Sequence, residues 1–178
     1  MHRRWDGWKR QDRFLVQQWI NLAGNDGRPC DIRVHLHKDG TGQWRLGGMG
    51  VREAAAGKIT SNVHSGGKVH EVIPYLSHRF GEEKASAMAQ QCERLAFVGA
   101  EHLEQTKNER LNELGFDFGI DVEGRIWLIE VNIKPGRHTI RTLYGAAGAK
   151  RCLQAQIDYA RYLLNQLPTP RAKNARSV

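Results

Sequence analysis

Residues 115–136 read GFDFGIDVEGRIWLIEVNIKPG and predict a β-hairpin. Two runs that alternate between apolar and polar residues flank Glu123 and Gly124, a pair suited to a tight turn. With a two-residue loop, Asp117 falls directly opposite Glu130. Their Cβ atoms would then be about 5 Å apart, and like charges at that distance destabilise a sheet. A cation would remove this repulsion, and ligands that are all oxygen atoms favour Mg²⁺ over zinc.

The two faces of this hairpin have different predicted surroundings. The face expected to line the core carries Phe118, Ile120, Val122, Trp127 and Ile129. The polar face carries Asp117 and Asp121 on the first strand and Glu130 and Asn132 on the second. The alternative is a half-exposed hairpin whose polar face simply meets water. Register decides between the two, because a three-residue loop would bring Asp117 opposite Ile129.

Composition indicates a soluble globular protein. Of 178 residues, 40% are hydrophobic and 26% are charged, and no apolar run approaches the roughly 20 residues that span a bilayer. The basic N-terminus lacks the apolar region of a secretory signal. The cysteines, Cys30, Cys92 and Cys152, lie far apart without CxxC spacing. This pattern favours reduced thiols and a cytoplasmic location, and argues against a disulfide framework or a zinc site.

The formal net charge of +8 is gathered largely at the two ends of the chain. Such a charge is compatible with nucleic acid, an anionic surface or a polyphosphate ligand. Basic ends are more often solubilising segments than binding sites, so specific nucleic-acid recognition is not favoured. We therefore expect a basic segment at 1–13, one domain at 14–167 and a disordered basic tail at 168–178.

The remaining pattern predicts an α+β fold, in which helices pack on one face of an antiparallel β-sheet. Strands are expected at 14–20, 30–37 and 43–52, followed by a helix at 82–111, the hairpin and a helix at 149–167. The inward stripe of helix 82–111 is expected to include Ala85, Met88, Ala89, Cys92, Leu95 and Ala96. The last helix is expected to turn inward Leu153, Ile157, Ala160, Tyr162 or Arg161, and Leu164. His35 and His37 share the polar face of strand 30–37, but without a third ligand they are interpreted as surface residues.

A glycine-rich segment at 57–69 is a candidate anion-binding loop. It ends in Gly66, Gly67 and Lys68, and backbone N–H groups beside a lysine commonly hold an anion. The spacing is not that of a Walker A loop, GxxxxGK[ST], so an exposed surface loop is the alternative interpretation.

In combination, these motifs resemble those of ATP-grasp ligases. The hairpin, with Asp on one strand and Glu-x-Asn before a Pro-Gly turn on the other, is similar to the magnesium site of that superfamily. Asp31-Ile32-Arg33 looks like its "DIR" element, and SNVHSGG at 61–67 resembles the "SNxHxGG" loop of its RimK-like branch. The order of the motifs along 14–165 is similar to that in the endospore coat-associated YheC/YheD group.

The resemblance implies roles for individual residues. Asp117, Glu130 and Asn132 would hold Mg²⁺, which Mn²⁺ could replace, against the phosphates of ATP. Gln18, Trp19 and Ile20 would form a hinge that offers main-chain hydrogen bonds to adenine. Arg33 and Arg52 would be catalytic and face the phosphates or an acylphosphate. Asn62, Gly66 and Gly67 would close over the phosphates, with Lys134 nearby.

The activity implied is that of a carboxylate–amine or carboxylate–thiol ligase that forms an acylphosphate on an unidentified carboxylate substrate. ATP-grasp enzymes hold ATP between two lobes, and the hinge-like segment lies close to Met1. We therefore expect the C-terminal lobe of an ATP-grasp fold without its first lobe, which is either lost by truncation or supplied by a second chain or a protein partner. The alternative is a non-catalytic, spore coat-associated descendant of such a ligase.

Overall fold

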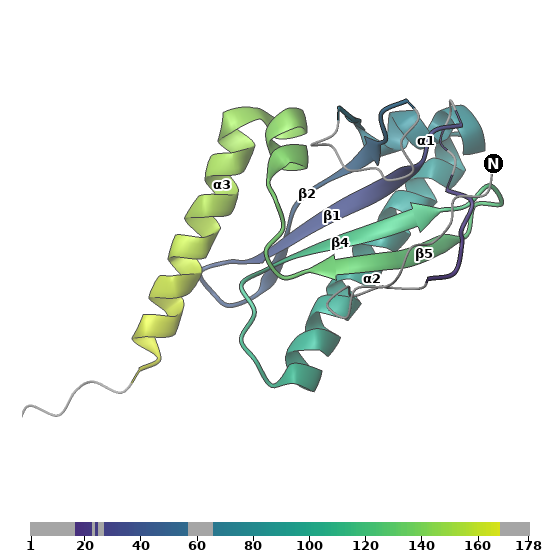
Figure 1. The fold of residues 1–178 in the computed structure, drawn as a ribbon. Coiled ribbons are helices and arrows are strands. Elements are labelled where there is room, and N and C mark those ends of the chain that lie inside the picture. The colour runs from purple at the N-terminus through teal and green to yellow at the C-terminus, as the bar shows by residue number, and fades with distance from the viewer. Residues whose placement is uncertain (1–16, 23, 25–26, 57–65, 168–178) are drawn as a thin grey trace, which may run out of the picture.

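The computed structural model describes residues 17–22, 24, 27–56 and 66–167, and the expected basic ends and Asn62 lie outside these ranges. The α+β class is confirmed: five antiparallel strands form one sheet in the order β3-β2-β1-β4-β5 (Figure 1). The elements are β1 (Cys30–Lys38), β2 (Trp44–Glu53), β3 (Lys68–His70), α1 (Val72–Phe80), α2 (Glu82–Lys107), β4 (Glu113–Ile120), β5 (Ile126–Asn132) and α3 (His138–Asn165). Residues 17–20 were expected to be part of a strand, but they are irregular.

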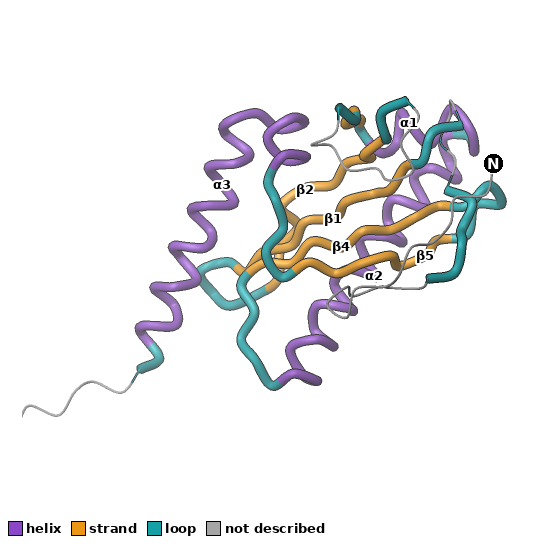
Figure 2. Tube along the Cα trace, in the orientation of Figure 1, coloured by secondary structure: helices purple, strands orange, loops and turns teal. Residues whose placement is uncertain are grey.

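The core lies between the sheet and helices α1 and α2, which cover the same face of the sheet (Figure 2). The alternation of β1 turns its apolar residues, among them Val34 and Leu36, toward these helices. The inward stripe of α2 is confirmed for Ala85, Met88, Ala89, Cys92 and Ala96. Leu95, which the pattern also places inward, is 42% exposed. One face of the sheet thus packs against α1 and α2, and the other carries the polar residues of the strands.

The hairpin pairs Asp117 with Glu130 as expected, but its loop length differs from the expected one. The Asp121 amide donates to the Arg125 carbonyl, which leaves a three-residue loop with Gly124 at φ 86°. A β-bulge that skips Ile129 then compensates for the extra loop residue, so Asp117 still lies opposite Glu130. The expectation of a two-residue loop is wrong, whereas the pairing of these two carboxylates is confirmed.

The longer loop also changes which side chains share a face. Phe118 and Ile120 are buried in the core as expected. Trp127 is not a core residue: its indole nitrogen donates to the Asp121 carboxylate at 2.9 Å, on the polar side of the hairpin. Val122 lies in the loop and is 49% exposed. The three-residue loop moves Trp127 opposite Gly119 instead of Ile120, and this shift exchanges the two faces of the returning strand from Ile126 to Leu128, before the bulge restores them.

Helix α3 begins eleven residues earlier than the expected start at 149, since it spans His138–Asn165 with a break in helical geometry at Gly145. It packs against the sheet face opposite α1 and α2: a Cβ atom at Gly50 would lie 2.5 Å from Leu143. Its buried side chains include Cys152 and Tyr159, so the expected inward stripe is wrong. The exposed fractions of Leu153, Ile157 and Leu164 are 48%, 49% and 64%.

Glycines of β2 explain how closely this helix face docks. A Cβ atom at Gly48 would lie 2.5 Å from Ile140 and 2.6 Å from Tyr144, so side chains of α3 fill the space that the glycines leave. The buried face of α3 therefore includes Ile140, Cys152 and Tyr159. Despite the 28 residues of α3, no helix in the described ranges is long and apolar enough to cross a bilayer.

All three cysteines are free and buried. Burial raises the pKa of Cys30 to about 11 and that of Cys92 to about 12, and it also raises the pKa of Cys152. Since the thiolate is the reactive form, these thiols are expected to react at least about tenfold more slowly than free cysteine at pH 8. Release of thionitrobenzoate from Ellman's reagent tests this. Three equivalents should appear rapidly only in denaturant, and fast release from the native protein would contradict the prediction.

Candidate functional site

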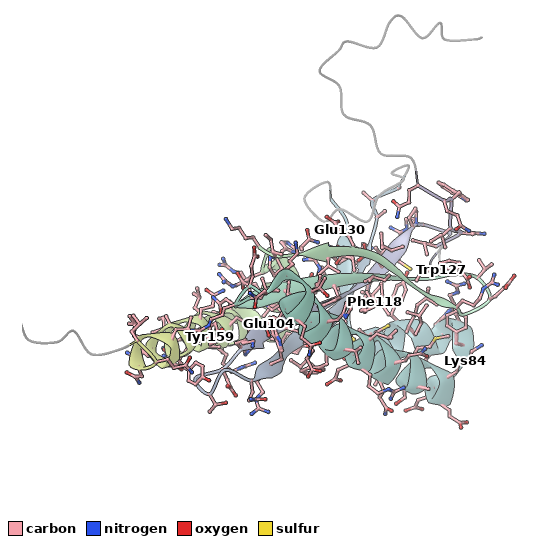
Figure 3. The ribbon with its side chains drawn as sticks, turned by 90° about the horizontal axis from the view of Figure 1, so that it is seen from below. Lys84, Glu104, Phe118, Trp127, Glu130 and Tyr159 are labelled. Carbon is pink, nitrogen blue, oxygen red and sulfur yellow. The ribbon has the colours of Figure 1, made fainter. Side chains whose placement is uncertain are left out.

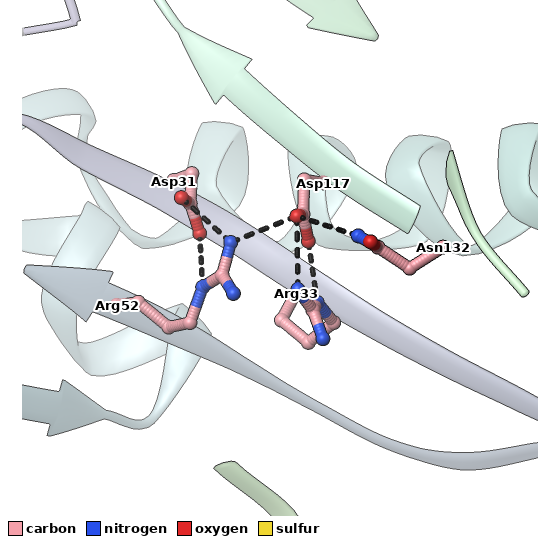
Figure 4. A network of polar contacts seen from close by, with 5 residues as sticks. All are labelled: Asp31, Arg33, Arg52, Asp117 and Asn132. Carbon is pink, nitrogen blue, oxygen red and sulfur yellow. Dashed lines mark hydrogen bonds and ion pairs between the residues drawn. The ribbon is translucent and has the colours of Figure 1, made fainter. Parts of the chain in front are cut away.

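A buried ion pair joins β1 to β4 on the polar face of the sheet. Arg33 and Asp117 are partners in the register of these strands. The Arg33 Nε donates to Asp117 Oδ1, and a terminal guanidinium nitrogen donates to Oδ2 at 2.9 Å, so the contact is bidentate (Figure 4). Both residues are less than 10% exposed. Removing either partner of this buried ion pair would lower the free energy of unfolding, because the remaining charge would stay buried without its counter-charge.

Arg52 extends the ion pair into a network across three strands. Its Nε and a terminal nitrogen donate to the two oxygens of Asp31 at 2.6 and 2.8 Å, and the same terminal nitrogen lies 3.0 Å from Asp117 Oδ2. Burial lowers the pKa of Arg52, but Asp31 and Asp117 outweigh that effect and raise it. Two arginines and two aspartates therefore balance one another across β2, β1 and β4 (Figure 4).

Two further oxygen ligands lie beside this network on β5. Asn132 donates from its amide nitrogen to Asp117 at 3.3 Å, which leaves its carbonyl oxygen as the atom available to a cation. Glu130 pairs with Asp117 in the strand register and is exposed. Figure 3 shows Glu130 on the side of the hairpin away from α2, whereas Phe118 lies on the side of α2. With the arginine–aspartate network balanced, Glu130 contributes a negative charge at this position.

The donor set fits a hard cation at Glu130 and Asn132 and fits it less well at Asp117. Oxygen ligands suit Mg²⁺, and the two β5 side chains supply one carboxylate and one amide oxygen. Asp117 instead accepts hydrogen bonds or ion pairs from Arg33, Arg52 and Asn132. A carboxylate has about four acceptor positions, and these contacts fill most of them. In this arrangement Asp117 chiefly positions the arginines, and the ligands open to a cation are Glu130 and Asn132.

A cleft of about 710 Å³ runs along this network, a volume within the range of small-molecule sites. One wall is the irregular segment 17–22 and the other is formed by the charged residues of the sheet. The cleft is lined by Gln17, Gln18, Trp19, Ile20, Asn21, Leu22, Gly27, Pro29, Cys30, Asp31, Arg33, Arg52, Asp117, Ile129, Glu130 and Asn132. Trp19 is 78% exposed, so its ring is open to solvent at the edge of this wall.

The structure brings together most of the residues that the sequence nominates, though not all of them. The hinge residues Gln18, Trp19 and Ile20, the two arginines and the three metal-ligand candidates share the cleft. Lys134 is exposed on the turn after β5 and lies outside the cleft lining. Gly66 and Gly67 precede β3 and do not line the cleft either, and Asn62 falls outside the described residues.

Sequence reasoning named Asp31 as part of the Asp31-Ile32-Arg33 motif but gave that residue no role. Asp31 is 8% exposed and binds Arg52 through both oxygens. The signal was present in the alternation of β1, which places Asp31 on the same face as Arg33. What the sequence did not show is the register that sets Asp31 opposite Arg52.

The fold and the cleft together define a class of protein. The antiparallel sheet is backed by helices, and its hairpin carries Asp on one strand and Glu-x-Asn on the other, beside two arginines. This arrangement is the C-terminal lobe of an ATP-grasp fold. The chain belongs to the YheC/D-like ATP-grasp family, whose profile matches residues 1–163. It is 34% identical over 127 residues to the endospore coat-associated protein YheD of Bacillus subtilis, and 27% identical over 133 residues to the endospore coat-associated protein YheC of the same organism. These alignments cover 70% and 73% of the chain, but only 27% of YheD and 35% of YheC.

Proposed function

We propose that this cleft binds Mg²⁺ and ATP and belongs to a ligase-type site that activates a carboxylate. The proposal rests on one observation: Glu130, Asn132 and two arginines line the same cleft. The opposite wall of this cleft is an irregular main-chain segment. An irregular segment such as 17–22 can offer main-chain hydrogen bonds to an adenine edge. Mg²⁺, or Mn²⁺ in its place, would act as a template and neutralise phosphate charge.

The chemistry that these residues suit is phosphoryl transfer, which depends mainly on positioning and charge neutralisation. The substrate carboxylate oxygen forms a bond to the γ-phosphorus as the bond to the β–γ bridging oxygen breaks, so ADP leaves and an acylphosphate forms. An amine or thiol then attacks the acyl carbon and releases phosphate. Arg33 and Arg52 would stabilise the phosphoryl oxygens. Asp31 and Asp117 hold both guanidinium groups in place before any substrate arrives.

ATP-grasp proteins enclose ATP between two lobes, and we propose that a second lobe covers the cleft, from this protein or from a partner chain. The substrate carboxylate is expected to contact that lobe as well, which is why its identity does not follow from these residues. A cytoplasmic location and the absence of specific nucleic-acid binding remain predictions from the sequence.

Replacing Glu130 with glutamine tests the nucleotide site. The wild-type chain is expected to bind Mg-ATP in isothermal titration at low salt, and Glu130→Gln to bind it at least about tenfold more weakly, a loss of about 1.4 kcal/mol. Glu130 is exposed, so the free energy of unfolding should change by less than about 0.5 kcal/mol. The matched control is Glu123→Gln, whose side chain is 65% exposed in the hairpin loop. Absence of heat from the wild type, or equal affinities in all three proteins, would contradict the proposal for this chain.

A second candidate is a non-catalytic protein of the spore coat. It is favoured by the names of the two relatives and by the nearly filled acceptor positions of Asp117. The candidates differ in turnover, since only a ligase-type site should hydrolyse or transfer the γ-phosphate. Phosphate release that disappears in Glu130→Gln would exclude the non-catalytic candidate.

A further inference from the structure

Three side chains that can bind a metal meet between the sheet and α3, outside the nucleotide cleft. His35 and His37 point from β1 to the same side as Arg33, and Cys152 comes from α3. One ligand atom from each residue lies within 4.8 Å of the other two. His35 is 0% exposed and Cys152 is 1% exposed, while His37 is half-buried. Cys152 thus lies beside two histidines that precede it by more than 100 residues, in a region almost inaccessible to solvent.

The imidazole nitrogens at this point lack the hydrogen bonds that burial normally requires. Both ring nitrogens of His35 and the Nδ1 of His37 are buried without a hydrogen-bond partner. The Nε2 of His35 lies 3.5 Å from the nearer oxygen of Glu113, beyond the usual hydrogen-bond length. An unsatisfied buried polar group costs about 1–3 kcal/mol, and a bound cation would remove that cost for both rings.

The sheet leaves room for the two rings. A β-bulge in β2 falls between the partners of His35 and Leu36 and leaves Gly47 unpaired. A Cβ atom at Gly47 would lie 2.9 Å from His37 Nδ1 and 3.0 Å from His35 Cδ2, so no larger residue fits without displacing the rings. Bulges of this kind often accompany functional sites.

A carboxylate lies beside this group, although it is not one of the three residues whose ligand atoms lie within 4.8 Å of one another. Glu113 pairs with His37 in the register of β1 and β4, and its carboxylate is held by Arg137 at 3.1 Å. The carboxylate is therefore fixed beside His35 and carries a charge that would help to neutralise a divalent cation. Imidazole nitrogen, thiolate sulfur and carboxylate oxygen are each ligands that zinc takes in proteins.

We propose that His35, His37 and Cys152 bind a zinc-like divalent transition-metal cation, with Glu113 as the fourth ligand. Atoms that share one zinc ion at about 2.0–2.3 Å lie roughly 3.3–3.8 Å apart, so a movement of about 1 Å closes the site. The site is separate from the nucleotide cleft, because none of its residues lines that cleft. The two sites also differ in chemistry: nitrogen and sulfur ligands favour zinc, whereas the oxygen ligands of the cleft favour Mg²⁺. Since Cys152 is on α3 and the histidines are on β1, the cation would fasten α3 to the sheet.

A metal binds neutral imidazole and thiolate, so protons and the cation compete for the same ligand atoms. Binding is therefore expected to weaken as the pH falls.

Titration of the full chain with Co²⁺ after dialysis against a chelator tests the proposal. One equivalent is expected to produce the near-ultraviolet charge-transfer band of a thiolate–cobalt bond, and Zn²⁺ should abolish the band. Cys152→Ala should lose the band, and His37→Gln should bind at least about tenfold more weakly. The matched controls are Cys92→Ala, on the opposite face of the sheet, and His102→Gln, on the exposed side of α2. Both should retain the band and the wild-type affinity, as should Glu130→Gln.

Zn²⁺ should also raise the thermal midpoint of the wild type and not that of His37→Gln, which provides a second readout. No charge-transfer band with Co²⁺, or a band that persists in Cys152→Ala, would overturn the proposal. If Cys152→Ala does not fold, His37→Gln decides the matter, and wild-type affinity in that variant would overturn the proposal as well.

Discussion

Replacing Asp117 with asparagine is expected to lower the free energy of unfolding by about 3–5 kcal/mol. Asp117 is 4% exposed and accepts from Arg33, Arg52 and Asn132. Without its charge, Arg33 keeps a buried guanidinium, with a side chain 9% exposed, beside a neutral amide. Arg52 is affected less, because Asp31 still binds it through both oxygens. The cost comes from the cation left unpaired and exceeds the net contribution of the intact pair.

Urea unfolding at pH 7, followed by circular dichroism, measures this loss. The control is Asp158→Asn, which removes a carboxylate from an exposed pair with Arg161 on α3 and should cost at most about 0.5 kcal/mol. A loss below about 1 kcal/mol for Asp117→Asn would show that Asp117 does not balance the two arginines. The result also affects the study of nucleotide binding. Asp117→Asn would confound loss of binding with loss of structure, whereas Glu130→Gln separates them.

Replacing Phe116 with alanine is expected to cost about 3–5 kcal/mol. Phe116 is 1% exposed and stacks against Phe118 with ring centroids 6.1 Å apart. A Cβ atom at Gly99 of α2 would lie 2.7 Å from its ring, so the ring fills the space between β4 and the helix. Truncation leaves a cavity that the helix backbone cannot readily close.

The same urea experiment applies, with Val98→Ala as the control. Val98 neighbours Gly99 on α2 but is 64% exposed, so the change in the free energy of unfolding should stay within about 0.5 kcal/mol. A cost for Phe116→Ala below about 1.5 kcal/mol would contradict the close packing of β4 on α2. Phe116 and Asp117 are adjacent in sequence and face opposite sides of the sheet, so this packing holds in place the strand that carries the charged network.

The hairpin shows how far sequence reasoning can reach. Alternation and turn composition predicted its strands, and the pairing of Asp117 with Glu130 is confirmed. The loop length and the bulge at Ile129 were not predicted, and their effects on register cancel from this pair to the pair of Gly115 with Asn132. A bulge depends on the neighbouring strands and the packing beneath them, and neither is contained in the local pattern of one segment.

Helix α3 and the histidines of β1 show where such reasoning stops. Leu153, Ile157 and Leu164 recur at helical spacing on α3 but are exposed, and the face with Ile140, Cys152 and Tyr159 docks instead. Glycines of β2 leave room for side chains of α3, and the docked face brings Cys152 to His35 and His37. Without the fold, two histidines on one strand lacked a third ligand and were indistinguishable from surface residues.

The sequence by itself determined the α+β class, the stripe of α2, the hairpin and the residue types of the proposed magnesium–nucleotide site, because these depend on local periodicity and on motifs of adjacent residues. Only the tertiary structure decided that Asp117 is held by two arginines, that Asp31 completes their network and that Cys152 joins two histidines. These are contacts between residues 21–117 positions apart, and strand register and helix docking set them through the packing of the whole domain.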